Sequence, residues 1–216
     1  MNEAPRLKIT EIFHSLQGES TFVGLPTVFV RLTGCPLRCH YCDTAYAFTG
    51  GEWMSLPDIL KRVSGYGARH VCVTGGEPLA QRECLPLLGA LCDAGYQVSL
   101  ETSGAIAIDQ VDARVSRVVD IKTPGSGEAA RNLYAQLALL SPHDQIKFVI
   151  TDRKDYDWSV AKIRELELAA RCTVLISPSH EQLPARELAD WVLADQLPVR
   201  FQLQLHKYLW GNVPGH

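Results

Sequence analysis

Short runs of apolar, β-branched residues alternate along this chain with segments whose apolar residues recur every three or four positions. The runs that predict strands are residues 27–32, 71–74, 98–101, 118–121, 146–150 and 174–176. The segments that predict helices carry apolar stripes within residues 56–63, 85–92, 133–140, 160–166 and 187–193. Strands that alternate with helices favour parallel pairing, because each helix carries the chain back to the start of the next strand. The pattern therefore predicts a single α/β domain with parallel strands.

Three stretches interrupt this alternation. Residues 14–26 and 34–53 are punctuated by glycine and proline, which predicts loops. The residues after Val199 are rich in aromatic and polar side chains and do not complete another strand–helix unit. Functional sites of parallel α/β proteins form at the C-terminal ends of the strands, so polar residues that directly follow a strand are the first candidates.

Length and charge exclude several classes of protein. The 216 residues suffice for one substantial core but not for two comfortable domains. A net charge of −3 offers no basic surface for nucleic acid. Residues 1–17 lack the apolar core of a signal peptide, and no apolar run approaches the ~18 residues that cross a bilayer. We therefore expect a cytoplasmic protein without a nucleic-acid or membrane partner.

Seven cysteines in a chain without an export signal argue against a disulfide framework. Four of them stand alone among apolar neighbours and are predicted to be buried thiols: Cys72, Cys84, Cys92 and Cys172. The other three lie in one loop, GCPLRCHYCDT, at Cys35, Cys39 and Cys42. This C-x3-C-x2-C spacing predicts a metal or redox site.

Three thiolates in a short loop are one too few for a tetrahedral zinc site, which four ligands close. They suit three corners of a [4Fe–4S] cluster and leave the fourth iron open to a substrate or cofactor. Two other readings account for less. A thioredoxin-like pair of Cys39 and Cys42 leaves Cys35 unexplained. A zinc site that borrows His40 would be strained, because His40 adjoins Cys39.

Polar motifs end three successive predicted strands. They are TGGEP from Thr74, ETSG from Glu101 and DIKTPG from Asp120. Consecutive glycines let the backbone approach a ligand closely, and the carboxylate of Glu77 can accept hydrogen bonds from an ammonium group. Each motif alone could be a solvated loop. Three in succession favour a ligand site.

The cysteine spacing, the aromatic Tyr41 before the last cysteine and the GGEP motif resemble those of the radical S-adenosylmethionine (SAM) enzymes. The resemblance implies an abbreviated, partial (β/α) barrel whose three loop cysteines hold a [4Fe–4S] cluster. The amino and carboxylate groups of SAM would chelate the open iron, and an external one-electron reductant of the flavodoxin or ferredoxin type would be required. The residues expected at SAM are Tyr41, Cys42, Asp43, Gly75, Gly76, Glu77, Glu101, Ser103 and Lys122.

Over essentially the whole chain, from EIFHSLQGESTFVGLP through the cysteine loop to HKYLWGN, the sequence is similar to the 7-carboxy-7-deazaguanine synthase family. The similarity implies a lyase that converts 6-carboxy-5,6,7,8-tetrahydropterin to 7-carboxy-7-deazaguanine and ammonia by radical-mediated ring contraction, on the route to queuosine. It also implies that the enzyme needs Mg²⁺, regenerates SAM and forms a homodimer. The expected domain is one radical SAM core over residues 1–216, with an N-terminal substrate loop and a C-terminal tail closing the site.

The same similarity assigns the pterin and the magnesium ion to particular residues. Arg31 lies in an apolar strand, where an unpaired charge is costly. Its planar fork suits the substrate carboxylate, and a salt bridge to an internal glutamate is the alternative. Thr44 matches the magnesium ligand, with a capping hydroxyl as the alternative, and Ser20 stands where many family members have glycine. The expected substrate contacts are Leu16, Gln17, Gly18, Glu19, Arg31, Thr74, His206 and the terminal carboxylate of His216.

Other functions remain open from the residues. A glycyl-radical activating enzyme shares the size and the cysteine spacing, but it needs no pocket for a pterin carboxylate. An iron–sulfur electron-transfer module would leave the three strand-end motifs unexplained. A colourless, zinc-stabilised α/β domain is the minimal alternative.

Overall fold

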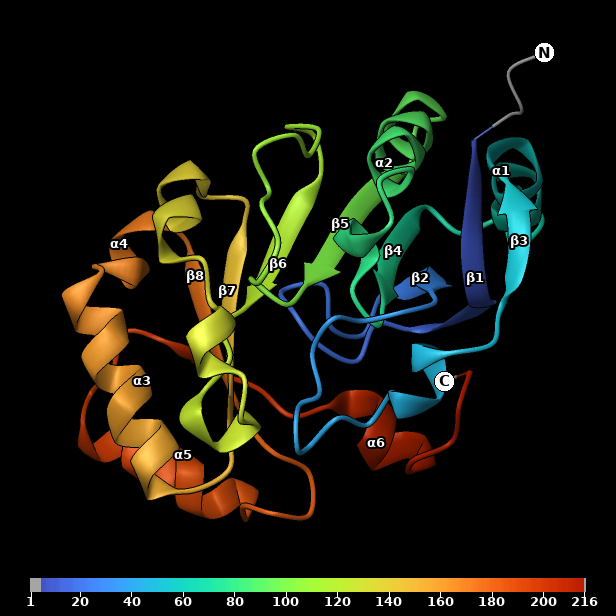
Figure 1. The fold of residues 1–216 in the computed structure, drawn as a ribbon. Coiled ribbons are helices and arrows are strands. Elements are labelled where there is room, and N and C mark those ends of the chain that lie inside the picture. The colour runs from blue at the N-terminus through green and yellow to red at the C-terminus, as the bar shows by residue number, and fades with distance from the viewer. Residues whose placement is uncertain (1–4, 216) are drawn as a thin grey trace.

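The computed structural model describes residues 5–215, which form one curved, nine-stranded sheet (Figure 1). The strand order is β3-β1-β2-β4-β5-β6-β7-β8-β9. The strands are β1 (Arg6–Leu16), β2 (Pro26–Leu32), β3 (Glu52–Ser55), β4 (His70–Gly75), β5 (Gln97–Thr102), β6 (Ser116–Asp120), β7 (Gln145–Ile150), β8 (Thr173–Pro178) and β9 (Arg200–Phe201). From β2 to β9 all neighbours in the sheet are parallel, whereas β1 runs antiparallel to both β2 and β3.

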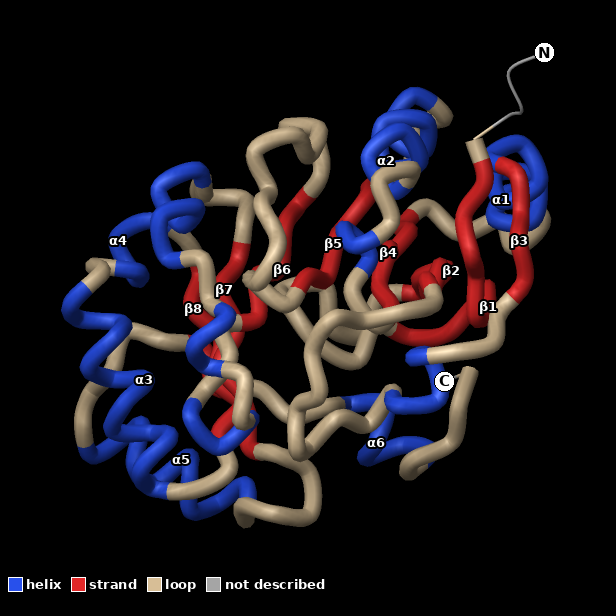
Figure 2. The backbone as a smooth tube through the Cα atoms, in the orientation of Figure 1, coloured by secondary structure: helices blue, strands red, loops and turns tan. Residues whose placement is uncertain are grey.

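Helices lie along the outer side of the curved sheet, while long loops and the last helix gather at its inner side (Figure 2). The α-helices are α1 (Leu56–Ser64), α2 (Cys84–Asp93), α3 (Arg153–Glu165), α4 (Leu168–Arg171), α5 (Ala185–Ala194) and α6 (Leu205–Trp210). Local chemistry fixes where α1 begins. The hydroxyl of Ser55 accepts a hydrogen bond from the backbone N–H of Asp58, as in an N-terminal cap.

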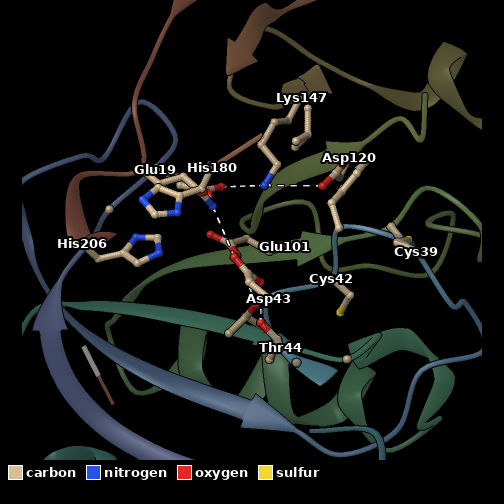
Figure 3. A pocket seen from close by; sticks show the side chains of 18 of the residues that line it. Glu19, Cys39, Cys42, Asp43, Thr44, Glu101, Asp120, Lys147, His180 and His206 are labelled. Atoms are coloured by element: carbon tan, nitrogen blue, oxygen red, sulfur yellow. Dashed lines mark hydrogen bonds and ion pairs between the residues drawn. The ribbon is translucent and has the colours of Figure 1, made fainter. Parts of the chain in front are cut away.

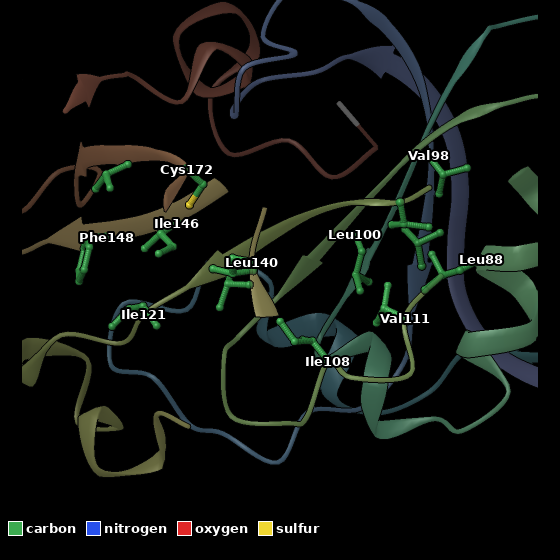
Figure 4. Packing of buried hydrophobic residues seen from close by; sticks show 14 of the residues in the cluster. Leu88, Val98, Leu100, Ile108, Val111, Ile121, Leu140, Ile146, Phe148 and Cys172 are labelled. Carbon is green, nitrogen blue, oxygen red and sulfur yellow. The ribbon is translucent and has the colours of Figure 1, made fainter. Parts of the chain in front are cut away.

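The hydrophobic core fills the space between the sheet and these outer helices (Figure 4). Strand β7 shows how one sequence serves both faces of the sheet. Ile146, Phe148 and Ile150 are buried in the core, whereas the alternate residues Lys147 and Val149 line a cavity on the inner side. Side chains of a strand alternate between its faces, so β7 joins the core directly to that cavity.

The predicted strand–helix alternation is confirmed, with four of the five predicted helical segments forming α1, α2, α3 and α5. The stripe within residues 133–140 instead forms a 3₁₀ segment, Tyr134–Leu139. The predicted burial of Cys72, Cys84 and Cys172 is confirmed. Cys92 is only partly buried and lies near the C-terminal end of α2.

Other differences concern the segments that were predicted as loops or as an irregular tail. Residues 14–16, predicted as loop, complete the antiparallel strand β1, and residues 52–53, also predicted as loop, begin β3. The tail after Val199 adds the short strand β9 and helix α6. Within the described part of the chain, no helix is long and apolar enough to span a membrane.

Candidate active site

A cavity of about 480 Å³ opens at the C-terminal ends of the central parallel strands (Figure 3). The N-terminal loop, the cysteine loop, the strand ends and the C-terminal tail all contribute to its wall. Of the predicted site residues, those that line it are Leu16, Gln17, Gly18, Glu19, Arg31, Cys35, Cys39, Tyr41, Cys42, Asp43, Thr44, Thr74, Gly75, Gly76, Glu101, Ser103, Lys122 and His206. The structure therefore brings together segments that are far apart in the sequence.

The cysteine loop is held from two sides. On one side, the backbone N–H of Glu77 donates to the carbonyl of Gly34 over 2.8 Å, and a Cβ added at Gly76 would collide with that same carbonyl. On the other side, the backbone N–H of His40 donates to the carbonyl of Ser126 over 3.0 Å. The GGEP turn and the loop after β6 thus fix the backbone on which the three cysteines stand.

The donor set of this loop fits an iron–sulfur cluster. Cys35, Cys39 and Cys42 all line the cavity. A [4Fe–4S] cluster binds each thiolate through a separate iron, so three cysteines around one cavity can hold three of its corners.

Burial makes two of these thiols reluctant to ionise before metal binds. It raises the pKa of Cys39 to about 11, and it also raises the pKa of Cys35. Because iron binds the thiolate, assembly of the cluster has to displace these protons.

The contact of Glu77 with SAM stays a prediction, and in this structure the side chain has other partners. Its side chain is 0% exposed and does not line the cavity. The carboxylate accepts hydrogen bonds from the hydroxyl of Thr102 at 2.9 Å and from the backbone N–H of Ser103 at 2.6 Å. Glu77 therefore ties the GGEP turn to the end of β5, and the two glycines before it present the backbone to the cavity.

Charged side chains form a chain of ion pairs along the strand ends. Lys122 lies 3.0 Å from Asp120 Oδ2, and Lys147 lies 3.4 Å from the same oxygen. The Asp120 carboxylate is the main reason that the pKa of buried Lys122 is raised despite its burial. The other oxygen, Asp120 Oδ1, is buried without a hydrogen-bond partner among the described residues. A donor group of a bound cofactor would satisfy this acceptor.

The C-terminal tail packs against the N-terminal loop, residues 17–25. Gly18 accepts a hydrogen bond from the backbone N–H of Leu205 over 2.9 Å, and any side chain at Gly18 would collide with the His206 ring. Glu19 Oε1 accepts from Gln204 Nε2 at 2.6 Å. The predicted contact of His216 lies outside the described residues.

Both readings of Arg31 find support. Arg31 Nε lies 2.6 Å from Glu11 Oε1, so the internal salt bridge exists. Tyr46 donates its hydroxyl to the same glutamate oxygen over 2.8 Å. Arg31 nevertheless lines the cavity, and its fork has further N–H donors beyond Nε. Contact with a substrate carboxylate stays a prediction.

Thr44 stands at the N-cap position of the 3₁₀ segment Ala45–Phe48, but its hydroxyl does not cap it. The hydroxyl donates to Asp43 Oδ1 over 2.8 Å, which leaves its lone pairs free to accept a cation. Asp43 is in turn paired with Lys207 at 2.6 Å, and this pairing holds the pKa of Asp43 well below its usual range. A magnesium ion at Thr44 fits this arrangement and stays a prediction.

Several cavity residues were not among the predicted site residues: Asp120, Lys147, His180, Gln204 and Lys207. Asp120 carried a signal as the first residue of the DIKTPG motif, and Lys147 interrupts the apolar run IKFVI in the same way that Arg31 interrupts TVFVRL. Lys207 belongs to the tail motif HKYLWGN, which is part of the family similarity, but no local pattern indicates that its partner is Asp43.

Comparison with known proteins agrees with this geometry. The Radical SAM superfamily model matches residues 29–119. A 7-carboxy-7-deazaguanine synthase of Chlorobaculum tepidum is 47% identical over 212 residues, which cover 97% of this chain and 96% of that protein. One from Koribacter versatilis is 43% identical and covers 94% of this chain and 97% of its own length.

A solved structure shows the same fold. The crystal structure of QueE from Escherichia coli matches with a TM-score of 0.76 at 26% sequence identity, covering 93% of this chain and 95% of that chain. Together with full-length relatives above 40% identity, this match fixes the assignment. The chain belongs to the 7-carboxy-7-deazaguanine synthase family of radical SAM enzymes.

Proposed function

We propose that this enzyme converts 6-carboxy-5,6,7,8-tetrahydropterin to 7-carboxy-7-deazaguanine with release of ammonia, in queuosine biosynthesis. One observation carries the proposal. A single cavity is lined both by the three cysteines of the cluster loop and by polar groups suited to a carboxylated pterin, among them Arg31 and Glu101. The family relationship supplies the identity of the substrate.

The cofactors are a [4Fe–4S] cluster and SAM, which when bound supply electron transfer and hydrogen abstraction. The chain itself binds and orients. The cysteine loop would hold the cluster, and the backbone of Gly75 and Gly76 lines the place where the methionine part of SAM would lie. Lys122 and Asp120, at the end of β6, would contact its polar groups.

The pterin would lie between the N-terminal loop and the strand ends. Glu101 accepts from Thr74 Oγ1 at 3.1 Å and from Gln17 Nε2 at 3.4 Å, so these groups form one polar wall. Burial and the nearby Glu19 charge raise the pKa of Glu101. A carboxyl group that can hold a proton can donate to a ring nitrogen or a carbonyl as well as accept.

We infer further properties from family membership. They are a magnesium ion at Thr44, a flavodoxin- or ferredoxin-type reductant, a homodimer, a cytoplasmic location and a single radical SAM core domain with its N-terminal loop and C-terminal tail. One contiguous hydrophobic core supports the single domain. The lone pairs of Thr44 support the magnesium site.

The test is anaerobic turnover of the reconstituted enzyme with dithionite, SAM, magnesium and 6-carboxytetrahydropterin. Appearance of 7-carboxy-7-deazaguanine by mass spectrometry is the expected result. Release of 5′-deoxyadenosine without this product would point to another substrate, such as the glycine of a partner protein. Absence of both, beside an active control enzyme, would favour an electron-transfer module.

A further inference from the structure

Lys147 is a buried cation at the centre of the cavity wall. It stands in the middle of β7 on the inner face, and its side chain is only 11% exposed. Lys147 Nζ lies 2.5 Å from Glu19 Oε2 and 3.4 Å from Asp120 Oδ2, so it bridges the N-terminal loop and the end of β6 (Figure 3). A buried lysine with two carboxylate partners remains charged, and these partners raise its pKa well above the usual range.

The ionised form of Glu19 is stabilised by Lys147 more than by any other group. Burial by itself favours the neutral carboxyl, but attraction to Lys147 and the hydrogen bond from it lower the pKa of Glu19. Gln204 Nε2 donates to the other oxygen at 2.6 Å. The two contacts fix the carboxylate in one orientation, and each oxygen keeps a lone pair for a further donor.

Glu101 lines the same cavity, but its pKa is shifted in the opposite direction from that of Glu19, because burial and the Glu19 charge raise it. Its hydrogen-bond partners are the neutral groups of Thr74 and Gln17, and among residues 5–215 it forms no ion pair. The cavity therefore holds one carboxylate that is held as an anion and a second whose surroundings favour the protonated form more than water does. Two carboxyl groups whose environments differ in this way can take different tasks toward one ligand.

We propose that Lys147 is a positioning residue, which holds the Glu19 carboxylate oriented and anionic so that it accepts hydrogen bonds from the amino and ring N–H donors of the substrate's pterin edge. This assignment rests on the proposed function, because the planar donor edge is that of the pterin. It deepens that function by naming the group that makes Glu19 a permanent acceptor. Lys147 itself makes no contact with the reacting atoms in this assignment.

The test measures substrate affinity without turnover. The enzyme with its cluster and SAM is titrated anaerobically with 6-carboxytetrahydropterin in the absence of reductant, by calorimetry, between pH 6 and pH 8. Iron content and SAM affinity are measured in parallel. The variants are Lys147→Met, Lys147→Arg and, as matched control, Lys162→Met, which removes a lysine that pairs with Glu165 outside the cavity wall and leaves the partner of Glu19 in place.

Lys147→Met is expected to weaken substrate binding by roughly tenfold or more at pH 8, as the loss of an oriented, charge-assisted acceptor predicts. The loss of substrate affinity in Lys147→Met grows toward pH 6, because a buried Glu19 without its cation takes up a proton as the pH falls. Lys147→Arg recovers most of the affinity. Lys162→Met is expected to keep the substrate affinity of the wild type at both pH values.

Other titrating groups surround Glu19, and they are present in wild type and variants alike. The charged and titratable groups that line the cavity around it are Lys147 of β7, Asp120 and Lys122 at the end of β6, Glu101 of β5, Arg31 of β2, Asp43 of the cysteine loop, His180 and Glu181 after β8, and His206 and Lys207 of α6. Their shared contribution is removed by comparing each pH profile with that of the wild type.

Unchanged affinity in Lys147→Met would overturn the assignment, and so would a loss that is the same at pH 6 and pH 8, which a merely structural role would give. Glu19→Gln tests the same point if Lys147→Met does not fold: it should weaken substrate binding by a similar factor at every pH. Unchanged substrate affinity in Glu19→Gln would contradict the proposed role of Lys147. A wild-type enzyme that neither binds nor converts the pterin would instead overturn the proposed function itself.

Discussion

Gly76 and Gly34 are in contact across the junction between β4 and the cysteine loop, and no methyl group fits between them. A Cβ at Gly76 would collide with the carbonyl of Gly34 and come within 2.9 Å of Cys35 Cβ. Gly76→Ala should therefore displace the loop backbone at a cost of about 1–3 kcal/mol. We expect its iron and sulfide content after reconstitution to fall well below that of the wild type.

Gly89→Ala is the matched control for this substitution. Gly89 lies within α2, and a Cβ there would meet nothing closer than Asp112 at 3.8 Å. Alanine favours a helix by up to about 1 kcal/mol over glycine, so this variant should be as stable as the wild type or more so. Full cluster loading in Gly76→Ala would show that the loop tolerates the displacement.

Ser20 adopts a backbone conformation that glycine favours, with φ of +67°. Its hydroxyl accepts a hydrogen bond from the backbone N–H of Phe22 at 3.2 Å, which offsets part of the strain. Ser20→Ala keeps the strain and loses this bond, so it should lower the free energy of unfolding by about 1 kcal/mol. Ser20→Gly relieves the strain and should cost less than Ser20→Ala. Urea denaturation compares the three proteins, and equal stability of Ser20→Ala and wild type would contradict this account.

The parts of the fold that the sequence predicted are those with a local cause. A β-branched run such as residues 146–150 forms a strand because its own side chains fill the core. The cysteine loop is equally local, since spacing alone places Cys35, Cys39 and Cys42 in one turn region. Both could be predicted without knowledge of any distant contact.

The parts that escaped prediction depend on contacts between distant segments. Pairing of Asp43 with Lys207 joins residues 164 positions apart (207 − 43), and no periodicity reports it. The motif at Glu77 does not reveal its contact with Thr102, because only the packed structure brings that hydroxyl to its carboxylate. A motif thus identified the place of the site, whereas the task of each side chain depended on the tertiary fold.

Lys207 fastens the C-terminal tail to the cysteine loop. Its side chain is 8% exposed, and Nζ lies 2.6 Å from Asp43 Oδ2. Lys207→Met should loosen the tail and speed proteolytic cleavage after residue 202 several-fold, because cleavage follows the population of the open form. Arg186→Met is the control, since Arg186 is 94% exposed and its ion pair with Asp190 spans 3.8 Å. Equal cleavage rates in the two variants would show that the ion pair does not fasten the tail.

Substitutions at Arg31 and Glu11 distinguish the two roles considered for Arg31, contact with the substrate carboxylate and an internal salt bridge. If the guanidinium holds the substrate carboxylate, Arg31→Ala weakens substrate binding by about tenfold or more, as expected for loss of a charged hydrogen bond. Glu11→Gln removes the competing anion and should leave substrate affinity unchanged or improved. Calorimetry without reductant measures both, with SAM affinity as the internal control. Normal substrate affinity in Arg31→Ala would leave only the internal salt bridge with Glu11.

Asp144 and Arg117 form a buried, two-pronged ion pair far from the cavity. Arg117 Nε lies 3.0 Å from Asp144 Oδ1, Arg117 Nη2 lies 2.6 Å from Oδ2, and the Asp144 side chain is 0% exposed. Burial alone would raise the pKa of Asp144, but the hydrogen bonds from Arg117 and Ser141 outweigh it and lower this pKa. Asp144→Asn leaves the arginine buried without its anion, so we expect a loss of about 3 kcal/mol at pH 7.

The pH dependence of this loss follows from the direction of the pKa shift. A carboxyl group with a lowered folded-state pKa stabilises the protein above its unfolded-state value, about 3.9, and this stability disappears as the pH falls through the folded-state value. The difference between wild type and Asp144→Asn should be equal at pH 7 and pH 5.5 and narrow in stronger acid. Asp157→Asn, which breaks the exposed pair with Arg153, should cost less than about 1 kcal/mol at any pH. Urea titrations of the three proteins measure both effects, and a difference that stays constant down to pH 3 would show that Asp144 is not the titrating group.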